Sequence, residues 1–183
     1  MAKRDLLYYI IHKPYGVLSQ FSEESGNPGL GSLYQLPKDI YPVGRLDRPT
    51  TGLLLFTNDG FLAKQLTHPS SKVSKTYHVH LDKKVTKSHL TQLVEGVNLD
   101  DGMTHADKAY YEGDMEDKSR IVIELHSGKN RVIRRMMEAL GYKVLRLDRT
   151  IFAGLTKKNL PRGKCRHLTE AEVGLLHRIS GLR

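Results

Sequence analysis

The chain has a single cysteine, Cys165, among its 183 residues. One cysteine excludes an intrachain disulfide, and there is no cysteine cluster that would hold a structural zinc ion. The apolar run near the N-terminus, Leu6 to Ile11, spans six residues and is followed by His12 and Pro14. It is too short for the hydrophobic part of a signal peptide or for a membrane span. These absences favour a reducing compartment, so we expect a cytoplasmic protein with no membrane attachment.

Motifs of several enzyme classes are also absent. The chain contains no Walker loop, no GxGxxG after a strand, no GxSxG, no HExxH and no CxxC. A metal site is conceivable because His78 and His80 share one face of an expected strand, and Cys165 and His167 offer a second pair. No third and fourth ligand stands at a familiar spacing. Surface histidines are therefore the favoured interpretation, and we expect no metal.

Positive charge is concentrated in the last third of the chain. The formal net charge is +9, and residues 118–183 hold 16 Lys and Arg against 5 Asp and Glu, whereas residues 1–117 are slightly acidic. A basic region of this kind attracts phosphate backbones. A solvated basic surface without a partner is the alternative, and charge alone does not decide between the two.

Hydrophobic periodicity predicts an α+β fold, with helices packed on a mainly antiparallel or mixed sheet. No repeat, low-complexity tract or long linker divides the chain, so we expect a single domain over 1–183, which two closely packed halves could compose. Helices are expected after the capping residues Asp59, Thr86 and Thr169, and across residues 133–140. The expected strands are Leu6–Ile11, Val17–Phe21, Leu53–Phe56, Lys75–Leu81, Arg120–Leu125 and Lys143–Asp148, with a ragged edge strand and hairpin loop in Asp107–Lys118 and a loop-rich tail in Arg149–Gly163.

Asp47 is the most notable carboxylate of the chain. It lies between Arg45 and Arg48, just before the apolar strand. Positive neighbours favour the ionised carboxylate, which makes Asp47 available as a nucleophile or a base. In the alternative, Asp47 caps the turn or pairs with an arginine to fix the loop. The local sequence alone favours that structural role.

Tyr77 is expected on the apolar face of the Lys75–Leu81 strand. A tyrosine there either packs in the core or offers its ring to a nucleobase and its hydroxyl to proton transfer. Considered alone, the position favours core packing.

Basic residues gather near the N-terminus of the helix expected over 133–140, where the helix dipole favours anions. They suit binding of phosphate or carboxylate, and one of them could pair with Asp47. In the alternative, two of them form weak surface ion pairs with Glu138. The four residues are Lys129, Arg131, Arg134 and Arg135.

Three stretches of the chain together resemble one protein family. They are GRLDRPTTGLLLFTNDG at 44–60, KTYHV at 75–79, and GKNRVIRRMM at 128–137 followed by VLRLDR at 144–149. These stretches are similar to the motifs of the RNA pseudouridine synthases, specifically the subfamily that modifies bacterial ribosomal RNA. The likeness runs from about Tyr8 to the C-terminus. It implies the pseudouridine synthase fold with an active-site cleft, isomerisation of uridine in ribosomal RNA, and no cofactor.

The same resemblance implies roles for individual residues. Asp47 corresponds to the catalytic nucleophile, Tyr77 to the aromatic residue beneath the target uracil, and Arg134 to the basic partner of Asp47. Leu147 corresponds to an apolar residue of the pocket. Because the target atom is hidden in stacked RNA, we expect the uridine to be flipped into this pocket. The residues expected to contact the RNA are Arg45, Arg48, Lys129, Arg131 and Arg135.

Two features depart from the usual pattern of this subfamily. Most relatives carry a small RNA-binding module before the catalytic domain, whereas here the first strand is expected almost at once, which resembles the large-subunit type E, as does SQFSEE at 19–24. Val132 stands where relatives commonly have Gln, which concerns a polar contact on the helix. We therefore expect a monomeric enzyme that acts on 23S rRNA. A non-catalytic, ribosome-associated RNA-binding protein on the same scaffold is the alternative.

Overall fold

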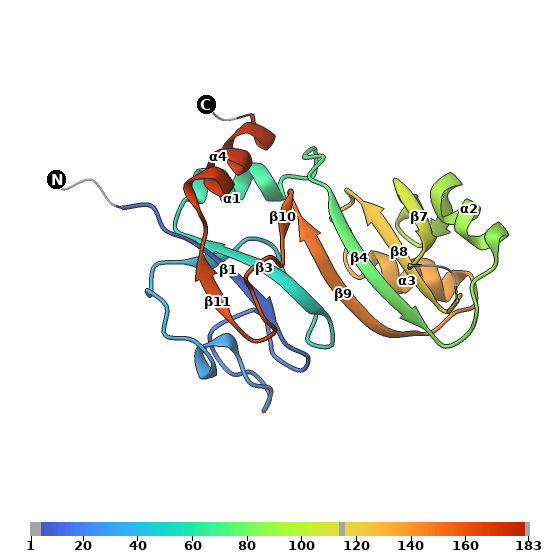
Figure 1. Cartoon of the computed structure of the whole chain (residues 1–183), viewed down its shortest axis with the longest axis horizontal. Coiled ribbons are helices and arrows are strands. Elements are labelled where there is room, and N and C mark those ends of the chain that lie inside the picture. Colours follow the sequence, from blue (N-terminus) through green and yellow to red (C-terminus); the bar gives the residue numbers. More distant parts are fainter. Residues whose placement is uncertain (1–4, 114–115, 182–183) are drawn as a thin grey trace.

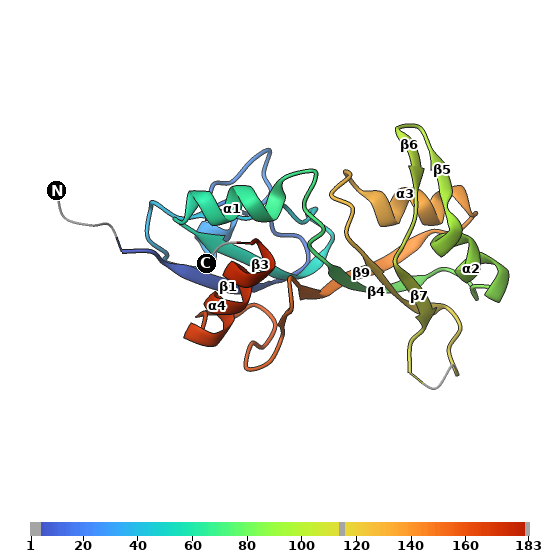
Figure 2. The same cartoon turned by 90° about the horizontal axis from the view of Figure 1, so that it is seen from above.

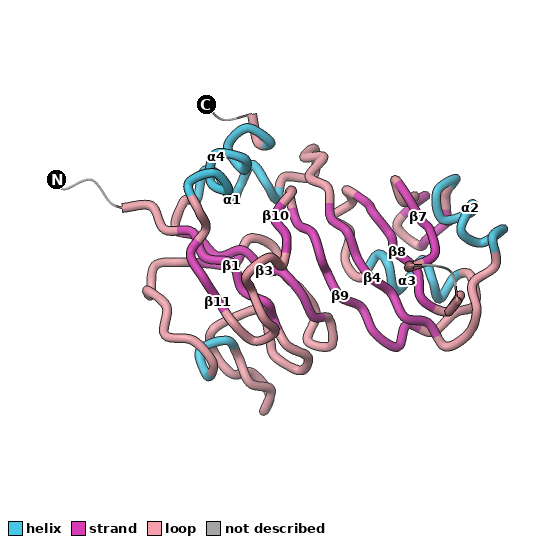
Figure 3. Tube along the Cα trace, in the orientation of Figure 1, coloured by secondary structure: helices cyan, strands magenta, loops and turns pink. Residues whose placement is uncertain are grey.

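The computed structural model describes residues 5–113 and 116–181 and shows a long mixed sheet (Figures 1 and 3) with helices on both sides (Figure 2). Residues 1–4, 114–115 and 182–183 of the predicted domain lie outside the described residues; positions 114–115 belong to the expected hairpin loop. The prediction of an α+β fold with a mixed sheet is confirmed. The strands are β1 (Tyr8–Lys13), β2 (Tyr41–Pro42), β3 (Thr51–Thr57), β4 (Lys75–Leu81), β5 (Val97–Leu99), β6 (Gly102–Thr104), β7 (Lys108–Tyr111), β8 (Arg120–Leu125), β9 (Val144–Phe152), β10 (Leu155–Thr156) and β11 (Cys165–His167).

The main sheet joins two antiparallel halves through one short parallel contact. Its strand order is β11-β1-β3-β9-β4-β8-β7, with β10 paired to β9 and β2 to β3. The parallel contact is between β3 and β9 and consists of the pairs Thr51–Asp148 and Gly52–Arg149. The other strand pairs of the described residues are antiparallel. The junction of the halves therefore lies just after Asp47 in the chain.

Helices cover the two halves separately (Figure 2). The helices α1 and α3 lie on the same side of the sheet, and α4 lies on the opposite side. In the second half, Ile133, Met136 and Met137 of α3 pack against buried residues of β4 and β8. In the first half, Leu62 and Leu66 of α1 pack against β1 and β3. The helices are α1 (Gly60–Thr67), α2 (Lys87–Glu95), α3 (Val132–Ala139) and α4 (Glu170–Ile179), with a 3-10 turn at η1 (Leu30–Ser32).

Each of the three capping residues identified in the sequence begins a helix. Asp59 Oδ1 accepts a hydrogen bond from the Leu62 amide at 3.1 Å, and Thr86 Oγ1 accepts one from the His89 amide at 3.1 Å. Thr169 forms a capping box with Glu172 before α4. These side chains satisfy amides that the helix itself leaves unpaired. Because this chemistry is local, it was predictable from sequence.

The expected strand Val17–Phe21 is wrong. The segment contains bends and forms backbone hydrogen bonds with the loop that follows it. The Leu18 amide donates to the Pro28 carbonyl, and the Leu30 amide donates to the Gln20 carbonyl. Its apolar residues pack without ladder pairing: Val17 lies in a third core cluster with Ile11, Leu54 and Phe56.

The loop-rich tail expected over Arg149–Gly163 is wrong in its first part. Strand β9 continues past Asp148 to Phe152, and β10 returns against it through the pair Leu155–Phe152. Strand β9 also pairs with β4 along its length. The extension depends on this non-local pairing, which the local sequence does not report. At the other end of the sheet, β7 is the edge strand that was expected.

Candidate active site

A cleft of about 890 Å³ lies between the two halves of the sheet. Its walls come from the loop that carries Asp47, the start of β4, the segment 126–133 and the middle of β9. Segments far apart in the sequence thus meet at one cavity. Of the residues predicted for the site, Asp47, Tyr77, Leu147, Arg45, Lys129 and Arg131 line this cleft.

Asp47 is presented by a tightly held loop between β2 and β3. The Ser19 hydroxyl donates to the Leu46 carbonyl at 2.5 Å and accepts from the Leu46 amide at 2.9 Å. The Thr50 amide donates to the Asp47 carbonyl at 2.9 Å. About a third of the Asp47 side chain remains exposed. The backbone is therefore fixed while the carboxylate can be reached from the cleft.

The ion pair of Asp47 is formed by Arg131 and not by Arg134. Arg131 Nη1 lies 3.2 Å from Asp47 Oδ2. Arg134 Nη2 instead donates to the Thr50 hydroxyl at 3.2 Å. The prediction that Arg134 pairs with Asp47 is therefore corrected to Arg131, and the reason for the difference is local. Arg131 is the residue before α3 and has a left-handed backbone with φ of +51°, so its side chain leaves the row of helical residues and reaches the carboxylate.

Arg134 nevertheless stays within the electrostatic reach of Asp47. Burial, with the charge of Arg131, lowers the pKa of Arg134, while Asp47 acts in the opposite direction. Arg134 Nε is buried and has no hydrogen-bond partner among the described residues. The alternative in which Arg134 and Arg135 serve as surface partners of Glu138 is not what the contacts show, since Arg134 bonds to Thr50 and Arg135 to Asp101.

Tyr77 and Leu147 form part of the cleft wall on neighbouring strands. In the β4–β9 register Val79 pairs with Leu147 and Tyr77 with Arg149, with an irregularity between Thr76 and Tyr77. Tyr77 is half-buried, and Leu147 is buried. A flat ring and an apolar side chain thus face the same cavity as the Asp47 carboxylate.

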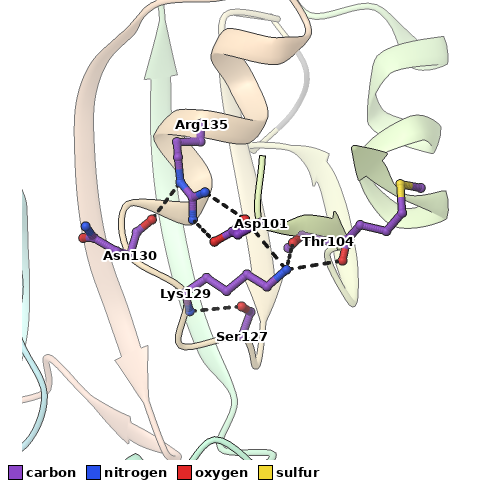
Figure 4. A network of polar contacts seen from close by, with 7 residues as sticks. Asp101, Thr104, Ser127, Lys129, Asn130 and Arg135 are labelled. Carbon is purple, nitrogen blue, oxygen red and sulfur yellow. Dashed lines mark hydrogen bonds and ion pairs between the residues drawn. The ribbon is translucent and has the colours of Figure 1, made fainter. Parts of the chain in front are cut away.

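A network of polar contacts fastens the β5–β6 hairpin to the segment before α3 (Figure 4). Arg135 donates to both oxygens of Asp101 at 2.9 and 3.1 Å, and its Nε donates to the Asn130 carbonyl. Lys129 Nζ donates to the Thr104 hydroxyl at 2.8 Å. Hydrogen bonds from Arg135 lower the pKa of Asp101. Arg135, expected to contact RNA, is therefore committed to holding this hairpin and does not line the cleft.

Arg48, the other residue expected to contact RNA, is exposed beside the cleft and is not part of its lining.

Within the described ranges 5–113 and 116–181, no group of three His, Cys, Asp or Glu side chains is placed to hold a metal ion. His78, one of the two histidines considered for a metal site, has its Nδ1 2.8 Å from Glu112 Oε1. In the same ranges, every helix falls short of the length and apolar character that crossing a membrane requires.

Residues 7–139 match the family described as RNA pseudouridylate synthase. The match covers more than half of the chain. The chain belongs to this family. The resemblance seen in the sequence motifs is confirmed, and the cleft is the candidate active site of a pseudouridine synthase.

Curated relatives of this synthase align with nearly its whole length. It is 36% identical over 181 residues to "Ribosomal large subunit pseudouridine synthase B" of Bacillus subtilis (strain 168), a match that covers 97% of this chain and 74% of the relative. It is 34% identical to "Ribosomal large subunit pseudouridine synthase E" of Vibrio vulnificus (strain CMCP6), which covers 92% of this chain and 77% of the relative. Relatives named for both type B and type E are therefore similar to it.

Solved structures agree with the family assignment. One described as "Crystal structure of pseudouridylate synthase" superposes with a TM-score of 0.82 at 28% identity, over 94% of this chain and 74% of the other. A second, "Structure of H/ACA RNP bound to a substrate RNA containing 2'-deoxyuridine", has a TM-score of 0.56 at 16% identity, over 84% and 50% of the two chains. The second likeness shows a shared fold alone.

Two buried cations and one half-buried cation near the synthase's cleft were not singled out from the sequence. Lys13 is fully buried and donates to the Arg48 carbonyl at 3.1 Å, and burial lowers its pKa to about 8. Lys75 lines the cleft, and burial with the charge of Arg149 lowers its pKa to about 8. Arg149, itself buried, donates to the Leu53 carbonyl at 2.7 and 2.9 Å. Only Arg149 lies inside a strand, where an apolar residue is usual; Lys13 is the last residue of β1 and Lys75 the first of β4, so their positions gave no such signal.

Proposed function

We propose that this protein converts uridine to pseudouridine at a specific position of 23S ribosomal RNA, with Asp47 as the nucleophile. The observation that carries the proposal is the meeting of the Asp47 carboxylate, the Tyr77 ring and the Leu147 side chain in one cleft. A partly exposed carboxylate on a fixed loop beside a flat ring suits attack on a nucleoside bound between them. Membership of the pseudouridylate synthase family supports this chemistry.

The reaction is an isomerisation and needs no cofactor. The bond between the sugar C1′ and the base N1 breaks as the Asp47 carboxylate attacks C1′, the uracil turns, and C5 then displaces the carboxylate from C1′. The C5 proton passes to solvent and N1 takes up a proton, so substrate and product are isomers. A carboxylate assists by attacking as a nucleophile, as one does in covalent glycoside cleavage. No second carboxylate is required, since water does not attack the sugar. In this proposal Tyr77 lies under the uracil, and Leu147 keeps the pocket apolar around it.

Arg131 and Arg134 divide the electrostatic work in this proposal. Arg131 pairs with the Asp47 carboxylate at the mouth of the cleft, where nearly half of its side chain is exposed. Such an exposed ion pair contributes about 1 kcal/mol or less to stability. An incoming RNA phosphate can therefore draw Arg131 away from Asp47 at little cost in free energy. Arg134 is the more buried of the two and is the cation that stays near Asp47 when Arg131 turns to the RNA.

Ribosomal RNA as substrate is supported by charge and by the relatives. Arg45, Lys129 and Arg131 surround the cleft, and Arg48 lies beside it. Cations at these places suit the phosphates of a strand whose target base has been flipped into the pocket. The two relatives named above are large-subunit enzymes, which favours 23S over 16S rRNA. We propose that the protein acts as a monomeric, single-domain enzyme in the cytoplasm.

Loss of tritium from C5 of uridine tests the function directly, because forming the C1′–C5 bond expels the hydrogen at that carbon. Full-length 23S and 16S transcripts labelled at this position are incubated with the purified protein. We expect release of one equivalent per target site from 23S rRNA and none from 16S rRNA. Binding of both transcripts without release would instead support the non-catalytic RNA-binding alternative. Release from 16S rRNA alone would overturn the large-subunit assignment.

A further inference from the structure

The turn after β1 is fastened to the residue that follows the nucleophile. The Gly16 amide donates to the Arg48 carbonyl at 2.8 Å, and Lys13 Nζ donates to the same carbonyl at 3.1 Å. Gly16 has φ of +83°, a conformation that glycine adopts without strain. Tyr15, between them in this turn, is therefore held at a fixed position relative to Asp47.

The Tyr15 side chain projects from this turn into solvent. It is 66% exposed, as much as any large apolar or aromatic side chain of the described residues. Within the same part of the chain, no ring–ring or cation–π contact involves Tyr15. A rigid turn thus displays an aromatic ring that the fold does not use for packing.

Two arginines lie near this turn. Arg48 Nη1 lies 3.9 Å from the point where a Cβ on Gly16 would stand, so the guanidinium is beside the turn. Arg134 lies near enough to Tyr15 for the two side chains to interact electrostatically. An exposed ring with cations nearby has the two components that single-stranded RNA needs, which are a stacking surface and partners for phosphate.

We propose that Tyr15 stacks on an unpaired base next to the target uridine, while Arg48 binds the phosphate between the two nucleotides. This inference rests on the proposed function, since it needs an RNA whose uridine has entered the cleft. Tyr15 does not line the cleft, so it does not contact the target base itself. Its attachment to the Asp47 loop places it within reach of the neighbouring nucleotide. The substrate class that follows is a loop or bulge with at least two unstacked bases.

The test compares Tyr15→Ala with Tyr15→Phe and uses Tyr41→Ala as the matched control. Tyr41 is equally exposed, but it pairs with Thr57 at the end of β3 remote from the Thr51 junction. Isomerisation of the labelled 23S transcript is measured under single-turnover conditions, together with rRNA affinity over a range of salt concentrations. The unfolding midpoint of each variant confirms that the fold is kept.

We expect Tyr15→Ala to weaken RNA binding and kcat/KM about 10-fold to 100-fold, the loss associated with one stacked base. Tyr15→Phe should keep most of both, because phenylalanine retains the ring. The slope of log affinity against log salt should stay unchanged in Tyr15→Ala, since no charge is removed. Tyr41→Ala should behave as the unmodified protein does.

Two results would overturn the proposal: unaltered binding by Tyr15→Ala, or an equal loss in Tyr15→Phe, which would assign the effect to the hydroxyl. Failure of the proposed function would look different. In that case the unmodified protein itself releases no tritium, while the contrast in rRNA affinity between the alanine and phenylalanine variants still decides the role of the ring.

Discussion

Replacement of Asp47 by asparagine is expected to abolish uridine isomerisation, with a fall in rate on the order of 10⁴-fold or more. Asparagine has nearly the same shape and can still accept a hydrogen bond from Arg131, so the loop and the cleft should persist. What it lacks is the anionic oxygen that attacks the sugar. RNA affinity should therefore remain within a few-fold of the unmodified protein, or rise slightly because Arg131 loses its ion pair and is held to residue 47 by a neutral hydrogen bond alone.

Single-turnover tritium release and equilibrium RNA binding separate these two effects. Asp117→Asn is the matched control, because Asp117 pairs with Arg120 in a loop that contributes nothing to the cleft lining. It should leave the rate unchanged. A rate for Asp47→Asn within about tenfold of normal would refute the nucleophile assignment, and an equal loss of affinity and rate would assign Asp47 a role in binding alone.

Gly52→Ala is expected to lower the free energy of unfolding by about 3 kcal/mol or more. Gly52 lies in the two-residue parallel contact that joins the halves of the sheet. A Cβ at this position would stand 2.2 Å from the Arg149 carbonyl oxygen and 2.5 Å from the Arg149 amide nitrogen, and the φ of Gly52 is +119°. Both neighbours are backbone atoms, so the alanine can be accommodated only if β3 and β9 separate.

Denaturant unfolding measures this loss, and Gly60→Ala is its control. Gly60 is the first residue of α1, and among the described residues nothing outside its chain neighbours and its own helix backbone lies within 4 Å of its Cβ position, so alanine there should be neutral or stabilise by up to about 1 kcal/mol. Because Asp47 and Arg149 lie on the two sides of the junction, Gly52→Ala should also lose activity at temperatures where it remains folded. Unchanged stability would mean that the parallel contact is not what holds the halves together.

Much of the fold was predictable wherever the determining interactions are local. Strands β4 and β8 have the predicted bounds, and the capping residues Asp59, Thr86 and Thr169 each precede a helix. The segment Val17–Phe21 was misassigned because its backbone bonds to the nearby loop, and the extent of β9 was missed because its partners are distant in sequence. Strand β9 extends beyond Asp148 because β4 still pairs with it there, across a register shift between Thr76 and Tyr77.

The site shows the same division. The local sequence favoured a structural role for Asp47, and only its combination with the Tyr77 strand and the arginine helix pointed to chemistry. The structure brings Asp47 and Tyr77 into one cleft. In the structure Arg131, and not Arg134, forms the ion pair with Asp47. The spacing of side chains along a helix does not predict the direction of Arg131, because Arg131 precedes α3 and has a left-handed backbone. The sequence GKNRVIRR does not predict this conformation at Arg131, because the residue usually found in the left-handed region is glycine.

The most direct test of the central claim is a map of pseudouridine in the ribosomal RNA of source cells that lack this protein, with either the unmodified protein or Asp47→Asn then supplied. We predict that one site in 23S rRNA loses its pseudouridine, that the unmodified protein restores it, and that Asp47→Asn does not. An unchanged map, or restoration by Asp47→Asn, would contradict the assignment of this cleft as a pseudouridine synthase site built on Asp47.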